Sequence, residues 1–86
     1  MWKIDMTKTA VKDYGNTRKS YYSKTIDNLI EILKTNPFQN PPPYKKMEPP
    51  TAETYSRRIN SQHRLYYRVY KEEKIVKIIR MWTHYE

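Results

Sequence analysis

The last third of the chain alternates arginines with tyrosines and ends in a short aromatic segment that contains a histidine. The arginines are Arg57, Arg58, Arg64, Arg68 and Arg80, the tyrosines are Tyr55, Tyr66, Tyr67 and Tyr70, and the final segment holds Trp82, His84 and Tyr85. Arginines reach phosphate groups, aromatic rings stack on nucleobases, and an imidazole transfers protons near neutral pH. Together these residue types are what a small RNA-cleaving site needs.

The composition limits the chain to one small basic domain. It has 86 residues, a formal net charge of +8 and no cysteine. A chain of this length buries only about 60% of the surface that its unfolded form exposes, so we expect a single domain over residues 1–86. Without cysteine there is neither a disulfide framework nor a cysteine-ligated zinc site, which fits a reducing cytoplasm.

The excess of Lys and Arg over Asp and Glu, 17 to 9, favours a polyanionic partner. Nucleic acid, an anionic membrane surface and an acidic protein segment all qualify, and charge does not choose among them. Nine tyrosines and two tryptophans, many beside cations, favour nucleic acid. No apolar run approaches the roughly 20 residues that cross a bilayer, and the first residues lack a signal peptide's apolar stretch. We therefore expect a cytoplasmic protein without a membrane partner.

The residues before position 37 predict one strand and two helices. Alternating polarity over residues 2–6 indicates the strand. Thr7 can cap a first helix, and Gly15 predicts either the end of this helix or a kink in it. We expect this helix to turn three residues inward: Ala10, Val11 and Tyr14. A second helix should bury one stripe of four residues at helical spacing, Ile26, Leu29, Ile30 and Leu33, and end at Asn36, before a proline.

All six prolines lie in one segment, residues 37–50. Proline donates no backbone hydrogen bond, so this segment cannot join a sheet interior, and we expect an ordered or semi-rigid surface crossing. A linker between two domains is the alternative, but neither side has enough residues for a core of its own.

Three strands are predicted after the prolines, over residues 55–59, 65–70 and 75–82, with a polar turn at 71–74. They should form an antiparallel meander. In the middle strand Leu65, Tyr67 and Val69 should face the helices, which leaves arginine and tyrosine on the opposite face. In the last strand Val76, Ile78, Arg80, Trp82 and His84 share one parity. If the registers align, Arg64, Arg80 and His84 reach one phosphate.

Three motifs follow one another along the chain: NPFQNPPPY at residues 36–44, SRRINSQHRLYYRVY at 56–70 and IIRMWTHYE at 78–86. Together they resemble the YoeB/Txe toxins of the RelE/ParE superfamily. The resemblance implies an α+β fold in which an N-terminal strand and two helices precede antiparallel strands that form a curved sheet packed on the helices. It also implies a ribosome-dependent endoribonuclease, the toxin of a type II toxin–antitoxin pair, which cuts messenger RNA in the ribosomal A site.

The resemblance also implies roles for individual residues. In this family the ribose 2′-OH attacks the adjacent phosphodiester and leaves a 2′,3′-cyclic phosphate and a 5′-OH, without metal or cofactor. By position, Arg64 clamps the scissile phosphate, His84 is the general acid and Tyr85 orients the nucleotide or phosphate. Further RNA contacts are expected from Lys46, Arg58 and Arg80. Arg57 points to the other face of an ideal strand, so we expect a structural or ribosome-facing ion pair at least as much as a phosphate contact. His63 should be structural.

One position departs from the family pattern. Relatives read PPYEKL where residues 42–47 of this chain read PPYKKM, so Lys45 replaces the usual glutamate base. A lysine with the ordinary pKa of about 10.4 is neutral in only about one molecule in a few thousand at pH 7. Lys45 then stabilises charge while another group takes the proton, or Glu48 supplies a substitute carboxylate, or the toxin is weakened or inactive. We expect weakened activity.

Two other functional classes stay open. A gyrase-directed toxin of the ParE branch is one, although the His84-Tyr85 pair and the arginine set argue against it. A catalytically inactive homologue that binds only RNA or antitoxin is the other. The implied partners are the ribosome with its message and a YefM/Axe-like antitoxin, whose acidic, flexible C-terminal segment would fold across the basic face. A homodimer is also open.

Overall fold

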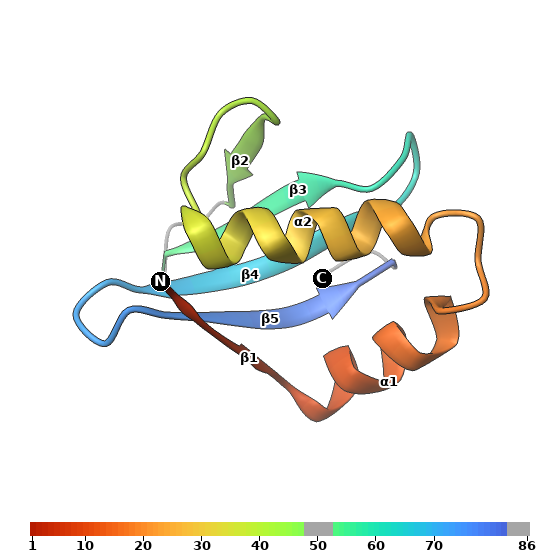
Figure 1. The fold of residues 1–86 in the computed structure, drawn as a ribbon, viewed down its shortest axis with the longest axis horizontal. Helices are drawn as coiled ribbons and strands as arrows, with labels where there is room; N and C mark the ends of the chain where they lie inside the picture. Colours follow the sequence, from red (N-terminus) through yellow and green to blue (C-terminus); the bar gives the residue numbers. More distant parts are fainter. Residues whose placement is uncertain (48–52, 83–86) are drawn as a thin grey trace.

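A computed structural model of the chain describes residues 1–47 and 53–82. Within these ranges two helices pack on a five-stranded sheet of order β1-β5-β4-β3-β2 (Figure 1). The elements are β1 (Lys3–Met6), α1 (Lys8–Thr17), α2 (Ser23–Thr35), β2 (Tyr44–Lys46), β3 (Thr54–Arg58), β4 (Arg64–Tyr70) and β5 (Ile75–Met81). Strand β1 pairs with β5 in parallel, and the other pairs are antiparallel. The expected α+β fold is confirmed.

Helix α1 begins where the sequence predicts but runs further. Thr7 is its N-cap and accepts a hydrogen bond from the Ala10 amide at 3.0 Å. Gly15 neither ends nor interrupts the helix, which continues to Thr17, so this prediction was wrong. A helix tolerates one interior glycine at a cost of about 1 kcal/mol. Val11, predicted inward, is 56% exposed because α1 covers only one end of the sheet, with Ala10 buried beneath it.

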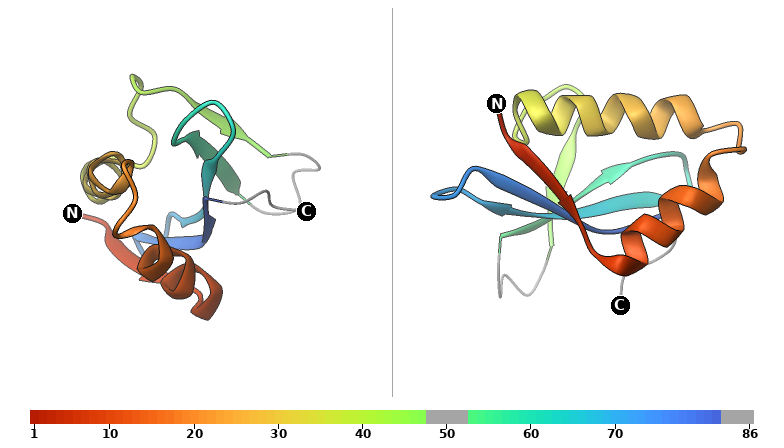
Figure 2. Two further views of the ribbon diagram at one scale, coloured as in Figure 1. Left: turned by 90° about the vertical axis from the view of Figure 1, so that its right-hand side faces the viewer. Right: turned by 60° about the horizontal axis from the view of Figure 1, so that its bottom comes forward.

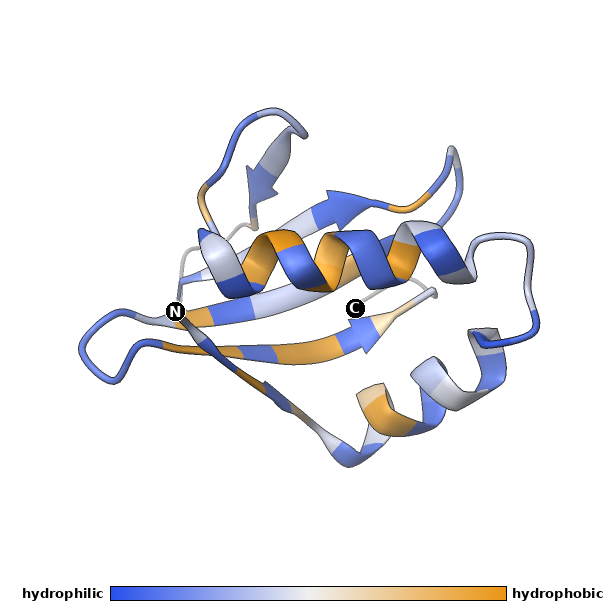
Figure 3. Cartoon of the chain, in the orientation of Figure 1, coloured by the Kyte–Doolittle hydropathy of each residue, from blue (hydrophilic) through white to orange (hydrophobic). Residues whose placement is uncertain are grey.

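Helix α2 and the core agree with prediction. Its apolar stripe is buried, and the helix ends at Asn36, whose amide caps the Ile32 carbonyl. Figure 3 shows the apolar residues along α2 and β5, and in the end-on view of Figure 2 the sheet curves from β5 to β2 around one side of α2. No helix within the described ranges combines the length and apolar character needed to span a bilayer.

The proline-rich segment contains an edge strand that the sequence did not predict. Residues 44–46 form β2, because they are not prolines and can pair with β3 at the sheet edge. The segment is also less superficial than expected, since Pro37 is fully buried. Its residues 48–50 lie outside the described part of the chain.

The end of β5 differs from the predicted alternation. Tyr66 pairs with Arg80 and Tyr67 with Ile78, so Ile79 is an extra residue that forms a bulge. The bulge places Ile78 and Met81 in the core and moves Arg80 to the opposite face, together with Tyr66. The predicted shared parity of Ile78 and Arg80 was therefore wrong. The strand ends at Met81, one residue early, and Trp82 adopts a left-handed φ of 82°.

Candidate active site

Cationic side chains from three neighbouring strands gather on the sheet face that lies opposite the helices. The register pairs Lys45 with Ser56 and Ser56 with Tyr66, and in the next row it pairs Arg58 with Arg64. Side chains directly opposite one another on antiparallel strands share a face of the sheet. The pairing of β2, β3 and β4 therefore brings residues from positions 45 to 66 into one site.

Two adjoining open cavities lie on this face. One of about 300 Å³ is lined by Lys45, Lys46, Met47, Ser56, Arg64 and Tyr66. The other, of about 390 Å³, is lined by Pro43, Tyr44, Lys45, Ser56, Arg58 and Arg64. Lys45, Ser56 and Arg64 line both, so the cavities form one continuous hollow. We call the four cations that line this hollow, Lys45, Lys46, Arg58 and Arg64, the cationic face; Lys46 alternates with Lys45 on the edge strand and lines only the first cavity.

The cationic face has no described counter-charge. Neither cavity has a carboxylate among its described lining residues. The ion pairs found between described residues lie elsewhere and join Lys34 to Glu31, Lys71 to Glu53 and Arg80 to Asp13. A concave surface lined by one sign of charge concentrates its field and attracts anions. This hollow therefore suits a phosphodiester.

The loop before β4 fixes the start of the strand that carries Arg64. The Asn60 side-chain oxygen accepts hydrogen bonds from the backbone amides of Gln62 and His63, both at 2.8 Å. The His63 ring stacks on Trp82 with centroids 4.0 Å apart, and the Trp82 amide donates to the Arg64 carbonyl at 2.9 Å. These contacts agree with the structural role expected of His63. They leave the half-buried Arg64 side chain directed to the hollow.

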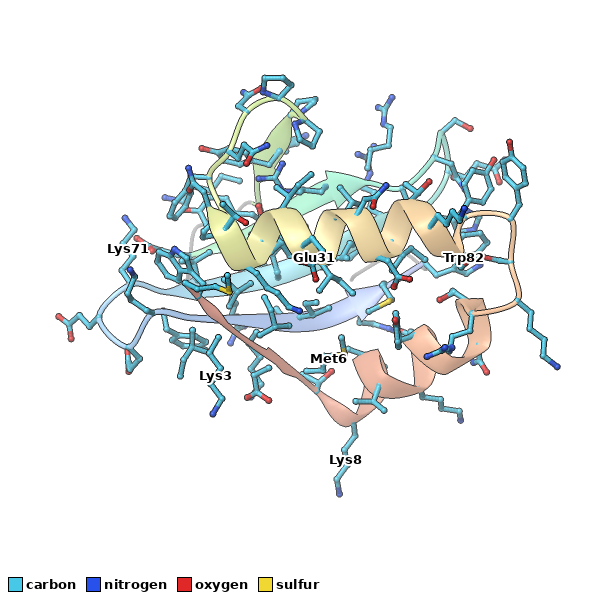
Figure 4. All side chains as sticks on the ribbon, viewed as in Figure 1. Lys3, Met6, Lys8, Glu31, Lys71 and Trp82 are labelled. Atoms are coloured by element: carbon cyan, nitrogen blue, oxygen red, sulfur yellow. The ribbon has the colours of Figure 1, made fainter. Side chains whose placement is uncertain are left out.

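Arg80 does not join Arg64 in the hollow. Its guanidinium contacts the Asp13 carboxylate of α1 at 3.2 and 3.3 Å, and it is absent from the described lining of both cavities. Trp82, two residues after Arg80, lies at the end of the molecule where α1 connects to α2, as Figure 4 shows. Lys71 marks the opposite end. The structure thus gives no support to a phosphate shared by Arg64 and Arg80, and an RNA contact by Arg80 stays a prediction.

Arg57 lies beneath the hollow, on the helix side of β3. Only 1% of it is exposed, and its guanidinium donates three hydrogen bonds to backbone carbonyls of the proline-rich segment. Its contacts are structural, but the expected ion pair was wrong. Its partners are carbonyl oxygens and not the carboxylate of an ion pair.

Two further expected site residues, His84 and Tyr85, lie outside the described residues, as does Glu48, and their roles stay predictions. Sequence reasoning missed Ser56, and it placed Tyr66 on the arginine face without assigning it to the site; both line the hollow, at 3% and 4% exposure. Both could have been found from alternation, since Ser56 shares a face with Arg58, and Tyr66 with Arg64. No group of three or more His, Asp or Glu suited to a metal ion occurs in the described part of the chain.

The site can hold an anion and stabilise charge that develops on it. A guanidinium contacts two phosphoryl oxygens at once through its planar fork, and Lys45 adds a point charge from β2, on the far side of β3. Preorganised cations of this kind are commonly the largest contribution to phosphoryl-transfer rates. None of the described side chains that line the hollow is a carboxylate or an imidazole able to accept a proton near neutrality.

Solved structures and a protein family both match this chain. The YoeB/ParE toxin from Agrobacterium tumefaciens is 27% identical, with a TM-score of 0.84 over 96% of this chain and 99% of that one. YoeB from Staphylococcus aureus, solved as a dimer, is also 27% identical, with a TM-score of 0.79 over 98% of each chain. The RelE–RelB complex from Pyrococcus horikoshii OT3, at 20% identity and a TM-score of 0.78 over 95% and 93%, shows the fold alone. Comparison with curated proteins gave no match.

The architecture is thus that of RelE-type toxins, small α+β proteins with a curved sheet. The family model that matches residues 6–85 describes the YoeB-like toxin of bacterial type II toxin–antitoxin systems. Because this match spans nearly the whole sequence, the chain belongs to the YoeB-like toxin family.

Proposed function

We propose that this chain is a ribosome-dependent endoribonuclease that cleaves messenger RNA in the A site. The observation that carries the proposal is the cationic face, where Lys45, Arg58 and Arg64 converge on one open hollow without a described carboxylate. The family supports the class of reaction, in which the ribose 2′-OH attacks the adjacent phosphorus. The P–O5′ bond then breaks, giving a 2′,3′-cyclic phosphate and a 5′-OH.

The reaction needs a base for the 2′-OH proton, an acid for the leaving 5′ oxygen, positive charge at the phosphoryl oxygens and in-line geometry. In the proposed mechanism Arg64 and Arg58 bind the two non-bridging oxygens. His84 donates the proton to the leaving oxygen, and Tyr85 orients the nucleotide, as the family resemblance implies. The ribosome contributes geometry by holding the codon.

Lys45 makes the proton-accepting step the weak point of this mechanism. In its protonated form the amine donates hydrogen bonds and cannot accept the 2′-OH proton. Its place on the cationic face, in both cavities beside Arg64, suits stabilisation of the phosphorane-like transition state instead. We therefore propose that cleavage is slower than in relatives with glutamate at this position, and that a ribosomal group or Glu48 accepts the proton.

The proposed protein partner is an antitoxin with an acidic segment. YoeB from Staphylococcus aureus has been solved in complex with YefM, with 27% identity and a TM-score of 0.79 over 99% of each chain. The cationic face offers an acidic segment the same contacts as it offers phosphates, so antitoxin and message would compete for it. Since a Staphylococcus relative is a dimer, we also propose self-association in the absence of antitoxin.

The test is cleavage of a defined message on purified ribosomes with a chosen codon in the A site, with free message as the comparison. We expect cleavage only on the ribosome, with fragments that carry a 2′,3′-cyclic phosphate and a 5′-OH. For substitutions in the cationic face, Arg68 is a suitable control position. Its Nε contacts Thr54 Oγ1 at 3.2 Å, and Arg68 does not line the hollow. Fragments with 3′-OH and 5′-phosphate ends would contradict the proposed chemistry.

Lys45 favours one alternative, a homologue that binds antitoxin or RNA but does not cut. Its positive charge at the position of the family's base is the observation behind this alternative. Tight binding of antitoxin, together with no cleavage at a toxin concentration equal to that of the ribosomes, would support it over the endoribonuclease.

A further inference from the structure

We propose that Arg57 is a positioning residue of the cleavage site: from beneath the sheet it holds residues 37–42, and so fixes β2 and Lys45 opposite Arg64. The inference rests on the proposed function for its catalytic consequence. Its structural part concerns this chain alone and is tested separately. Arg57 lies between Ser56 and Arg58, which both line the hollow, but its own side chain points to the helix side of β3.

The guanidinium of Arg57 gathers carbonyl groups from a segment that has few other backbone contacts. One terminal nitrogen donates to the Pro42 carbonyl at 2.7 Å, and the other donates to the Pro37 and Gln39 carbonyls, both at 2.9 Å. The prolines of this segment have no amide hydrogen, so they cannot close a backbone ladder of their own. Arg57 supplies the hydrogen-bond donors that the prolines of this segment lack.

Two tyrosine rings hold the guanidinium in place. Its central carbon lies 5.1 Å from the centroid of the Tyr44 ring and 5.9 Å from that of Tyr67. The Tyr67 hydroxyl donates to the same Pro37 carbonyl at 3.0 Å. We call the contacts that Arg57 and Tyr67 make with residues 37–42 the clamp. Because Tyr44 is the first residue of β2, its contact with Arg57 joins the clamp directly to the strand that carries Lys45.

Strand β2 depends on this clamp for its position. It has three residues and pairs with β3 alone, at the edge of the sheet. The residues that precede it turn from Asn36 to Tyr44 over the Arg57 side chain. Arg58 and Arg64, by contrast, stand on paired strands inside the sheet. Loss of the clamp should therefore move Lys45 without displacing the two arginines.

The chemistry of the contact requires arginine. Arg57 takes part in no ion pair between described residues, and its buried charge is compensated by three carbonyl dipoles. A lysine keeps the charge but lacks a planar fork that reaches carbonyls on both sides. A methionine keeps much of the volume and removes the buried charge, which proteins commonly tolerate in cores. Lysine thus tests whether the charge alone is sufficient, and methionine tests whether packing alone is sufficient. Neither replaces the planar guanidinium and its hydrogen bonds.

The first measurement is amide hydrogen exchange of the isolated protein, which needs no RNA. We expect Arg57→Lys and Arg57→Met to accelerate exchange at the six non-proline amides of residues 37–46 by about tenfold or more while residues 65–69 of β4 stay protected. Arg68→Lys is the matched control, because it makes the same change on the neighbouring strand without a contact to residues 37–46. Equal acceleration throughout the molecule, or none in residues 37–46, would overturn the proposal.

The second measurement separates kcat from KM on programmed ribosomes. Misplacement of a catalytic group by about 1 Å costs on the order of 100-fold in rate, so both Arg57 variants should lose kcat on that scale. KM should stay within about twofold, because Arg58 and Arg64 keep their places on β3 and β4. Wild-type kcat in Arg57→Met would show that Arg57 only fills space and would overturn the positioning role.

A variant that fails to fold does not end the test. Tyr67→Phe removes one hydroxyl from the clamp and keeps the ring, and we expect the same local exchange pattern at smaller amplitude. Unchanged exchange in a folded Tyr67→Phe, with Arg57 variants unfolded, would assign Arg57 to global stability and reject the clamp. If the wild-type chain itself does not cleave, the proposed function fails, and the exchange pattern alone decides whether Arg57 positions β2.

Discussion

Two consecutive arginines of β3 have opposite environments. Arg58 is exposed on the cationic face, whereas Arg57 is buried beneath it and bound to carbonyl groups. The alternation of a strand is sufficient to separate them, because successive side chains point to opposite faces of a sheet. One residue step thus separates an arginine that lines the hollow from one that holds the backbone of the proline-rich segment.

Arg64→Ala should lower single-turnover cleavage by about 100- to 1,000-fold, the usual cost of one transition-state contact. The physical reason is the loss of a two-pronged charged donor from the wall shared by both cavities. Rapid-quench cleavage of a message held on ribosomes measures this rate. The control is Arg68→Ala, which removes the same kind of side chain four residues further along β4. A comparable loss of rate in the control would contradict the assignment of Arg64.

Lys45→Glu should raise the cleavage rate, because it places the family's carboxylate base where the structure has an amine. A carboxylate is ionised near neutral pH and can accept the 2′-OH proton. The comparison is made with Lys46→Glu, which adds the same charge one residue along β2 and should not accelerate cleavage. Equal rates for the wild type and Lys45→Glu would show that this reaction needs no carboxylate at position 45.

The position of Arg58 and Arg64 beside one hollow could be predicted, because strand alternation and family position agree at both residues. Their contact with phosphate stays a prediction. Ser56 and Tyr66 follow the same alternation. Ser56 was missed because a serine in a strand does not by itself indicate a phosphate site, and Tyr66 was placed on the arginine face but given no site role. Alternation placed Arg57 on the other face of β3, but its hydrogen-bond partners could not be predicted. Its partners are carbonyls 15 to 20 residues away, and no side-chain pattern in the sequence reports a backbone oxygen.

At the scale of elements, α1 secures the bulged end of β5. The Thr7 hydroxyl donates to the Ile79 carbonyl at 2.7 Å while it accepts the Ala10 amide at 3.0 Å. Asp13 accepts from the Arg80 side chain and from the Met81 amide at 3.2 Å. A bulge leaves ladder groups without partners, and the helix supplies them here. Helix α1 therefore acts less as core than as a cap on one end of the sheet.

Thr7→Ala should destabilise the protein by about 1–2 kcal/mol, since it removes both a helix N-cap and a hydrogen bond to the bulge. Urea unfolding followed by circular dichroism gives the free energy of unfolding. Thr9→Ala is the control, because Thr9 is exposed on the same helix and alanine is the better helix former there. A Thr7 variant as stable as the Thr9 variant would contradict a double role for Thr7.

Helix α2 and strands β3 to β5 were predictable because each has a local apolar period. Strand β2 and the β5 bulge were not, because both exist only through pairing with residues far along the chain. Tyr44–Lys46 has no strand-like alternation that distinguishes it from the prolines around it. The shift at Ile79 is visible only when Tyr66 and Tyr67 are matched to their partners.

At the scale of the whole molecule, charge is distributed unevenly. The described ion pairs neutralise cations at the ends and on α2, and they leave the four residues of the cationic face without a described carboxylate. A formal net charge of +8 favours polyanions in general, and the hollow is the place where cations without a described carboxylate are concentrated.

Arg58→Gln should reduce the salt dependence of binding to a single-stranded RNA that carries 2′-deoxy substitutions and cannot be cut. Each lost phosphate contact lowers the slope of log affinity against log salt by about 0.7. Lys19→Gln, an exposed cation of the α1–α2 connection, has the same charge change away from the cationic face and should leave the slope closer to that of the wild type. Fluorescence anisotropy over a salt series measures both; identical slopes would contradict a phosphate contact at Arg58.

Alkaline pH should weaken the whole fold through Tyr67. Burial raises the pKa of its phenol from 10.0 to about 12. Between these values the unfolded chain has released the proton and the folded chain still holds it, so the free energy of unfolding falls as pH rises. The stability that the neutral phenol contributes is complete below about pH 10 and is lost as pH rises toward about 12.

The measurement is urea unfolding from pH 8 to pH 11.5 for the wild type and Tyr67→Phe, since phenylalanine cannot ionise. Lysines also titrate in this range, so only the difference between the two curves reports on Tyr67. We expect that difference to change in favour of Tyr67→Phe above about pH 10. Tyr21→Phe, which removes an exposed phenol, is the control and should follow the wild type throughout. Ionisation of the Tyr67 hydroxyl also removes a donor from the Pro37 carbonyl, which Arg57 holds as well; parallel unfolding curves for the wild type and Tyr67→Phe would refute a contribution from Tyr67 ionisation.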